Sequence, residues 1–187
     1  MIIGEIIYDI LQDKELSGDS TKWANWMAQF TLTTCLFCIK KHGSIVDISV
    51  LKNKTQVFAH EKCKCVYVAM RTRQAGSATN HGADGADIHL LYFNTLPDYY
   101  VTKENARAAG WISWLGNLDN VLPRKMIGGN VYKNREGKLP KQPGRIWYEA
   151  DINYTGGFRT HDRILYSNDG LIVVTYDHYQ TFSEITN

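Results

Sequence analysis

The chain has 187 residues, a length that allows one medium domain or two small ones, each with a buried core. Hydrophobic residues make up 44% of it and charged residues 21%, a composition typical of folded proteins that excludes a mainly disordered chain. The formal net charge of +2 is too small to indicate nucleic-acid binding by itself, because such binding needs a concentrated basic patch. No segment has the roughly 20 apolar residues of a membrane span, and the first residues lack a signal-peptide pattern. We therefore expect any export to depend on something outside this chain.

The N-terminal third is predicted to be helical. Apolar residues recur at helical spacing over residues 1–12, which predicts an amphipathic helix. A break with a helix cap follows near Ser17, and a second helix is predicted after it. The apolar residues on one face of this second helix are Trp23, Trp26, Met27 and Phe30. We expect that face to pack in a core.

Two domains are predicted from the distribution of residue types. All four cysteines lie between Cys35 and Cys65, which marks residues 1–70 as a separate Cys-containing module. Residues 71–83 are small and polar and have no periodicity, so they are predicted to form a linker. Residues 84–187 then form the second domain.

This second domain is predicted to have short helices first and an antiparallel sheet after them, which is the α+β class. Asp84 is placed to cap one short helix, and Thr102 is placed to cap another that ends at Gly110. A further short helix is predicted within 111–122. The strands are predicted from period-two alternation and an Asp-Gly turn, at 146–152, 163–166, 171–176 and 179–185.

Two residues of this domain could act as an acid–base pair. Glu149 lies within a predicted strand, and His178 lies in a turn between two strands of the same sheet. Arg159 and Arg163 follow the Glu149 strand, and Lys103 lies in the first turn of its helix, where the macrodipole disfavours a cation. Cleavage of RNA needs a base, an acid and fixed cations around the phosphate, and these residue types supply all three.

The segment from Leu96 to Asn187 resembles the family of bacterial guanyl-preferring ribonucleases that includes barnase. The resemblance holds over about half of the chain, with near-constant spacing between its motifs. These motifs are Leu96–Lys103, Ala109–Trp111, Ile127–Gly129, Asn134–Pro140, Glu149–Thr155, Gly157–Arg159, Asp162–Ser167 and Asp177–Phe182.

This resemblance implies a microbial-ribonuclease fold and a metal-independent endoribonuclease that cuts single-stranded RNA by transesterification, through a 2',3'-cyclic phosphate. It implies that Glu149 is the general base and His178 the general acid, and that no cofactor takes part. The residues implied to hold the scissile phosphate are Lys103, Arg159 and Arg163.

The resemblance also implies a preference for guanosine. Guanine would bind to backbone amides and to the Glu136 carboxylate, in a loop whose substrate-binding residues are Tyr132, Asn134, Arg135 and Glu136. Tyr132 and Tyr179 would stack on bases. The chain departs from the family at Lys133, where a small residue is usual, and at Tyr148, where a basic residue is usual. The segment before Pro97 matches only loosely.

The cysteines of the N-terminal module leave three alternatives open. The spacing Cys35-x-x-Cys38 with His60-x-x-Cys63-x-Cys65 offers enough soft ligands for a structural zinc site, with Cys35, Cys38, Cys63 and Cys65 as the metal ligands. Two disulfides in an exported protein are the second alternative, and four reduced thiols are the third.

The same region is similar to the C-terminal part of phage minor head (Mu F-like) proteins. The matching positions are Thr31, Cys35, Cys38, His42, Gly43, His60, Cys63 and Cys65. Such segments are found before the toxin domains of bacterial polymorphic toxins. The similarity implies that residues 1–70 are a delivery or pre-toxin module.

We therefore expect a two-part toxin that is secreted or delivered into a target cell as part of a larger exported protein. Its expected partners are single-stranded RNA and a small acidic immunity protein, similar to barstar. The alternative is a phage-derived structural or assembly protein that keeps a catalytically silent, RNA-binding ribonuclease fold. The presence of both Glu149 and His178 favours the enzyme.

Overall fold

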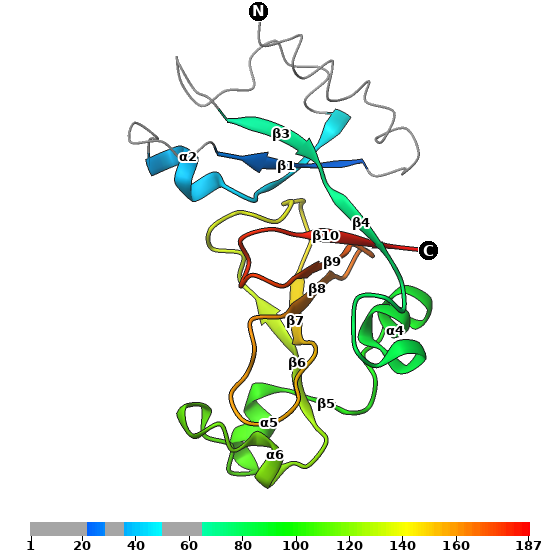
Figure 1. Ribbon diagram of the computed structural model, residues 1–187, viewed down its shortest axis with the longest axis vertical. Helices are drawn as coiled ribbons and strands as arrows, with labels where there is room; N and C mark the ends of the chain where they lie inside the picture. The colour runs from blue at the N-terminus through cyan, green and yellow to red at the C-terminus, as the bar shows by residue number, and fades with distance from the viewer. Residues whose placement is uncertain (1–21, 29–35, 50–64) are drawn as a thin grey trace, which may run out of the picture. The chain divides into compact units, whose positions relative to one another are not determined.

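The structure is a computed structural model that describes residues 22–28, 36–49 and 65–187 (Figure 1). The chain divides into two compact units, each considered by itself below. The first comprises Met1–Thr72, Asn134–Gln142 and Gln180–Phe182, and the second comprises Arg73–Lys133, Pro143–Tyr179 and Ser183–Asn187. No helix within the described ranges is long and apolar enough to span a membrane.

The first unit contains a three-stranded antiparallel sheet and one short helix. The strand order is β2 (Ile45–Asp47), β1 (Trp23–Met27), β3 (Val66–Ala69), and the helix is α2 (Leu36–Lys41). Its buried core consists of Ala24, Trp26, Ala28, Cys38, Cys65 and Tyr67. This core is rich in aromatic rings, because Trp26 contacts Tyr67 edge to face with 5.2 Å between ring centroids.

The predicted helix around Trp23 is wrong, because residues Trp23–Met27 form the central strand β1. Large aromatic residues favour strands as well as helical cores, and strands on both sides bury four of the five β1 residues. A strand buried in this way has no alternation that would distinguish it from a helix. Phe30 and the helix predicted over 1–12 lie outside the described residues.

The second unit is built on a seven-stranded sheet with short helices, which confirms the α+β prediction. The strand order is β4-β10-β9-β8-β7-β6-β5. Strands β6 to β10 pair antiparallel, and β5 pairs parallel with β6. The strands are β4 (Arg71–Gln74), β5 (Tyr100–Val101), β6 (Met126–Tyr132), β7 (Trp147–Asp151), β8 (Arg163–Ser167), β9 (Ile172–Thr175) and β10 (Ser183–Thr186).

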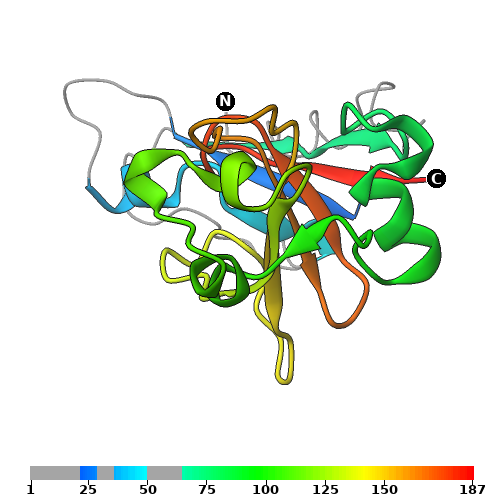
Figure 2. The same cartoon turned by 90° about the horizontal axis from the view of Figure 1, so that it is seen from below.

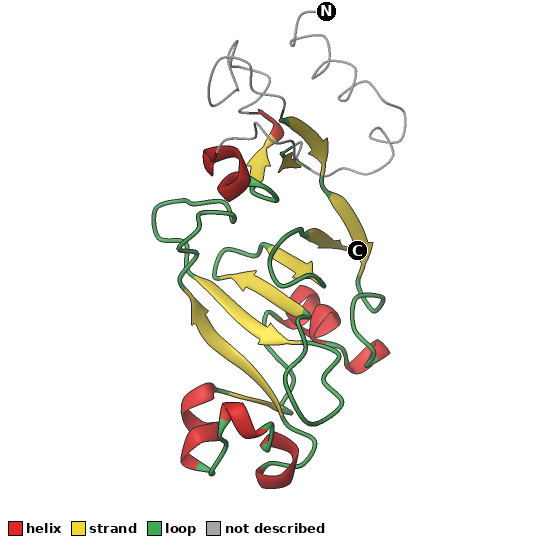
Figure 3. Ribbon diagram, turned by 60° about the vertical axis from the view of Figure 1, so that its left-hand side comes forward, coloured by secondary structure: helices red, strands yellow, loops and turns green. Residues whose placement is uncertain are grey.

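The helices of this unit gather at two places along the sheet (Figures 1 and 2). Helix α4 (Ala86–Phe93) packs against β8, β9 and β10, over a core that includes Leu90 and Ile164. Helix α5 (Lys103–Ala108) packs against β6 and shares a second core with α6 (Leu118–Val121). Figure 3 shows these short helices beside the long central strands. The two cores thus pack against different strands of the same sheet, with β7 between β6 and β8.

Several local predictions are confirmed. The side-chain oxygen of Thr102 accepts a hydrogen bond from the N–H of Asn105 at 3.2 Å, so Thr102 caps α5 as predicted. The predicted hairpin between β8 and β9 is present, with Gly170 at φ 91° in its turn. The helix predicted within 111–122 is split into the 3-10 turn η3 (Ser113–Leu115) and α6.

The segment 71–83, predicted as a linker, is ordered by backbone hydrogen bonds. It contains β4, and it leads to the 3-10 turn η2 (Gly82–Asp84). The fully buried carboxylate of Asp87 accepts hydrogen bonds from the N–H groups of Gly76 and Ala78, at 2.8 and 3.0 Å. The small polar residues of this segment therefore form ordered structure around a buried carboxylate, although their composition is that of a linker.

Candidate active site

The carboxylate of Glu149 lies at the centre of the site, in the middle of β7. Its neighbours across the sheet are Asn130 on β6 and Leu165 on β8. The pairing of β6 with β7 shifts by one residue between Gly128 and Asn130, at Gly129, whose φ is 79°. Bulges of this kind redirect side chains, and this one brings Asn130 opposite Glu149. The prediction that Glu149 lies on a strand is confirmed.

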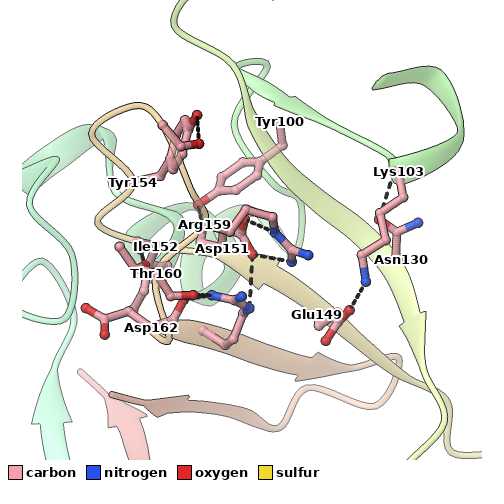
Figure 4. A network of polar contacts seen from close by, with 12 residues as sticks. Tyr100, Lys103, Asn130, Glu149, Asp151, Ile152, Tyr154, Arg159, Thr160 and Asp162 are labelled. Carbon is pink, nitrogen blue, oxygen red and sulfur yellow. Dashed lines mark hydrogen bonds and ion pairs between the residues drawn. The ribbon is translucent and has the colours of Figure 1, made fainter. Parts of the chain in front are cut away.

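Two donors hold Glu149. The ammonium group of Lys103 donates to Oε1 at 2.5 Å, and the hydroxyl group of Tyr179 donates to Oε2 at 2.8 Å. The N–H of Lys103 donates to the side chain of Asn130 at 3.0 Å, which fixes the start of α5 beside the sheet (Figure 4). Lys103 therefore has an anionic partner within the protein, which offsets its unfavourable position in the first turn of α5.

These neighbours keep Glu149 ionised although it is only 9% exposed. Burial by itself raises the pKa of this carboxyl group, because it penalises the charged form. The hydrogen bonds from Lys103 and Tyr179, with the charges of Lys103 and Arg159, outweigh burial and lower the pKa below its ordinary value. A buried base that stays charged near neutral pH is the result.

A second carboxylate, that of Asp151, organises the two arginines. Asp151 lies two residues after Glu149 on β7, is 1% exposed, and pairs across the sheet with Arg163. Arg159 donates two hydrogen bonds to it, at 2.6 and 2.7 Å (Figure 4). Nε of Arg163 lies 3.0 Å from Oδ1 of the same carboxylate. Arg163 also donates to the backbone oxygens of Thr160 and Asp162. Both guanidinium groups are thereby fixed on the β7–β8 side of the site.

Sequence analysis did not assign a role to Asp151. The period-two pattern had placed it on the same face as Glu149, and two nearby arginines need a counterion when they are buried. Together these two signals were sufficient to find it.

His178 and Tyr179 follow β9 in a tight turn. Both have positive φ values, of 56° and 68°, which is uncommon for residues other than glycine. The turn is held by the hydroxyl group of Thr175, which donates to Asp177 at 2.9 Å and accepts from the N–H of Tyr179 at 3.0 Å. Strained backbone of this kind occurs where surrounding contacts determine the conformation, often at functional sites.

The ring of Tyr179, which binds Glu149, belongs to a series of aromatic rings in contact with one another. Tyr179 stacks on Tyr132 with 5.3 Å between ring centroids, and His178 lies 5.0 Å from Tyr179. His161 stacks on His178 at 5.0 Å, with 27° between the two ring planes. His161 was not found by sequence analysis, because a single histidine in a loop carries no pattern. The base-stacking role predicted for Tyr132 and Tyr179 stays a prediction.

Asn134, Arg135 and Glu136 belong to the first compact unit, where they form the start of a loop. Asn134 is buried, and its side chain donates to the backbone oxygen of Leu139 and accepts from its N–H, so it closes the loop. The Glu136 carboxylate is largely exposed, with a side-chain exposure of 68%, and lies 3.6 Å from the ammonium group of Lys138.

The proposed metal ligands are only partly described. Cys38 and Cys65 are both buried, whereas Cys35 and Cys63 lie outside the described residues. In the ranges that the structure covers, no group of three or more His, Cys, Asp or Glu residues is placed to hold a metal ion. The choice between zinc, disulfides and thiols stays as the sequence left it.

The first prediction concerns the stability that Asp151 provides. We expect Asp151→Asn to lower the free energy of unfolding by about 3–5 kcal/mol, because it leaves two largely buried guanidinium groups without their anion. Urea denaturation of the variant measures this loss. Asp169→Asn is the matched control, because Asp169 pairs with Arg145 at the surface, where such a pair is worth about 1 kcal/mol or less. Equal losses in both variants would contradict the central position of Asp151.

The second prediction concerns the pKa of Glu149. We expect Tyr179→Phe to raise this pKa, because it removes a hydrogen bond that favours the charged carboxylate. Carboxyl NMR titration of the wild type and the variant measures the shift. Because the folded pKa is lowered, the carboxylate stabilises the wild type above its ordinary pKa, and this contribution is lost as the pH falls through the folded pKa. In the variant this contribution should be smaller, and its loss should be complete at a higher pH.

Tyr148→Phe is the control for this titration, because Tyr148 precedes Glu149 on β7 but stacks on Tyr166 instead. Its substitution should leave the Glu149 midpoint where it is. A midpoint that falls, or stays constant, in Tyr179→Phe would show that the Tyr179 hydroxyl does not hold the carboxylate.

Comparison with known proteins identifies the family to which this chain belongs. A ribonuclease family model matches residues 86–186. The chain is 54% identical over 102 residues to a ribonuclease of Heyndrickxia coagulans. The matched region covers 54% of this chain and 94% of that relative. It is also 54% identical over 102 residues to ribonucleases of Bacillus intermedius and Bacillus pumilus, and the match covers 63% of each. This chain therefore belongs to the ribonuclease family, and it is an endoribonuclease.

Proposed function

We propose that the chain cleaves single-stranded RNA by transesterification, with Glu149 as the general base and His178 as the general acid. The observation that carries this proposal is the state of Glu149: a carboxylate that is buried, lowered in pKa and surrounded by fixed cations. A general base must be ionised before the reaction begins. Burial shields it from water, and its hydrogen bonds orient it.

In the first step, the Glu149 carboxylate takes the proton of the ribose 2'-hydroxyl. The 2'-oxygen then attacks the phosphorus, and the bond to the 5'-oxygen of the next nucleotide breaks. His178, as the imidazolium, donates a proton to that leaving oxygen. The products are a 2',3'-cyclic phosphate and a free 5'-hydroxyl. In the second step the two residues exchange roles, and water opens the cyclic phosphate.

Negative charge gathers on the phosphate oxygens during the attack, and Lys103, Arg159 and Arg163 are the cations proposed to stabilise it. Asp151 orients both arginines before substrate arrives, so they need little rearrangement. Three fixed cations supply the charge that a divalent ion supplies in other phosphoryl-transfer enzymes. We therefore propose that the reaction needs no metal.

The third prediction tests the acid–base pair. Glu149→Gln and His178→Ala should each lower kcat/KM for single-stranded RNA by about 10²- to 10⁴-fold, the usual contribution of a positioned acid or base. Cleavage should persist in the presence of a chelator and yield a cyclic phosphate, whereas an RNA with 2'-deoxyribose at the cleaved position should resist. Unchanged rates in either variant, or efficient cleavage of the 2'-deoxy substrate, would exclude the mechanism.

The biological role is proposed to be that of a toxin, with residues 1–70 as a delivery or pre-toxin module of a larger exported protein. Support comes from the resemblances of the two halves and from the cationic site, whose charge suits a small acidic immunity protein. The same variants extend the third prediction to cells. Wild-type expression should arrest growth, and Glu149→Gln should not; equal growth of both would argue against a toxin.

We also propose a preference for guanosine, based on the resemblance of the loop that contains Glu136. The exposure of this carboxylate supports the proposal, because a carboxylate that accepts from guanine must be accessible. The two hydrogen bonds between Asn134 and Leu139 also support it, because they fix the ends of the loop before a ligand binds.

The fourth prediction tests this preference with dinucleotides. Glu136→Gln should lower the ratio of kcat/KM for GpU over ApU by about 5- to 150-fold, which corresponds to the roughly 1–3 kcal/mol of a bidentate base contact. Glu104→Gln is the control, because Glu104 is an exposed carboxylate in the first turn of α5. A ratio that stays constant in Glu136→Gln would refute the role of this carboxylate.

A further inference from the structure

Two loops of the second unit expose large apolar side chains that the proposed mechanism does not use. Trp114 and Leu115 in η3 are 77% and 57% exposed, and Phe158 in the loop after β7 is 68% exposed. The other four tryptophans of the chain are buried, each at 8% exposure or less. An exposed Trp is therefore the exception in this protein, and exposed apolar groups that lie together indicate a binding surface. We call these three residues the aromatic platform.

The two loops lie against each other at glycines. Gly116 has φ 60°, and a Cβ there would lie 3.0 Å from the carbonyl carbon of Gly157 and 3.1 Å from the nitrogen of Phe158. Only glycine permits so close an approach. The backbone next to Leu115 thus lies against the backbone next to Phe158, so the exposed side chains of the platform come from two neighbouring segments.

Hydrogen bonds hold both loops in place. The side chain of Asn117 accepts from the N–H of Ile112 at 2.7 Å and donates to the oxygen of Gly110 at 3.0 Å. On the other loop, the hydroxyl group of Tyr154 donates to the oxygen of Gly157 at 3.0 Å. A surface that is ordered before binding loses little conformational entropy when a ligand arrives.

The loop that carries Phe158 also carries one of the proposed phosphate-binding cations. Phe158 directly precedes Arg159, whose guanidinium group is bound to Asp151 and whose charge lowers the pKa of Glu149. One loop thus presents a cation for the phosphate backbone and, one residue away, an exposed ring. Alternation of cations and aromatic rings is the usual arrangement for binding single-stranded nucleic acids, in which phosphates contact the cations and bases stack on the rings.

We propose that the aromatic platform is a stacking subsite for a base of single-stranded RNA that lies outside the dinucleotide being cleaved. This inference rests on the proposed ribonuclease activity. Stacking tolerates any base, because every base has a π-face. The platform should therefore strengthen the binding of longer substrates without changing the base preference at the cleaved bond.

The fifth prediction compares substrates of different length. Trp114→Ala should lower kcat/KM for a single-stranded oligonucleotide of about eight residues by about 5- to 150-fold, which corresponds to roughly 1–3 kcal/mol for one stacked base. Cleavage of the dinucleotide GpU should change less than twofold, because a dinucleotide does not reach the platform. Trp114→Phe keeps a ring and should recover most of the loss. Tyr92→Ala is the control, because Tyr92 is 59% exposed on α4, away from the platform loops.

Equal losses on both substrates would show that Trp114 supports the fold or the chemistry and would overturn the proposal. No loss on either substrate would also overturn the proposal. A protein partner would then be the remaining candidate ligand of this surface.

A binding measurement separates this proposal from the proposed function. In the Glu149→Gln variant, titration with the same oligonucleotide should quench the fluorescence of Trp114, and Trp114→Phe in that background should abolish the quenching. Quenching without any cleavage by the wild type would refute the mechanism and keep the subsite. Cleavage by the wild type without quenching would refute the subsite and keep the mechanism.

Discussion

The carboxylate of Asp151 is the charge on which the arrangement of the site depends. Two guanidinium groups close together repel each other, and burial makes each of them more costly. Asp151 offsets both effects, because it is 1% exposed and contacts Arg159 and Arg163 at the same time. It therefore turns two cations that would avoid each other into a fixed array beside Glu149, ready for a phosphate.

Glu149 and Asp151 show how one strand gives two carboxylates different properties. Both point to the same face of β7, two residues apart. Asp151 is surrounded by two arginines and is fully engaged. Glu149 is held by one lysine and one tyrosine, and its side chain keeps 12% exposure. A carboxylate enclosed by two arginines is suited to a structural role, whereas one held by a lysine and a phenol, with part of its surface exposed, can exchange a proton.

The sequence predicted features that depend on nearby residues, and it missed those that depend on distant pairing. The cap at Thr102 and the β7 position of Glu149 were predicted because each depends on a few neighbouring residues. The strand at Trp23–Met27 was mistaken for a helix, because it is buried by strands far away in the chain. The parallel pair of β5 with β6 and the stack of His161 on His178 were missed for the same reason.

The loop between β7 and β8 is anchored by one carboxylate at three points. Asp151 ends β7, Arg163 begins β8 opposite it, and Arg159 reaches back to it from within the loop. The ion pair between Asp151 and Arg159 holds both ends of this stretch of chain. The residues between them can therefore be ordered without being buried. An exposed ring such as Phe158 can therefore stand beside the phosphate-binding cations without loosening them. Substitutions at Phe158 should change what the loop presents to RNA, while the cations stay where Asp151 holds them.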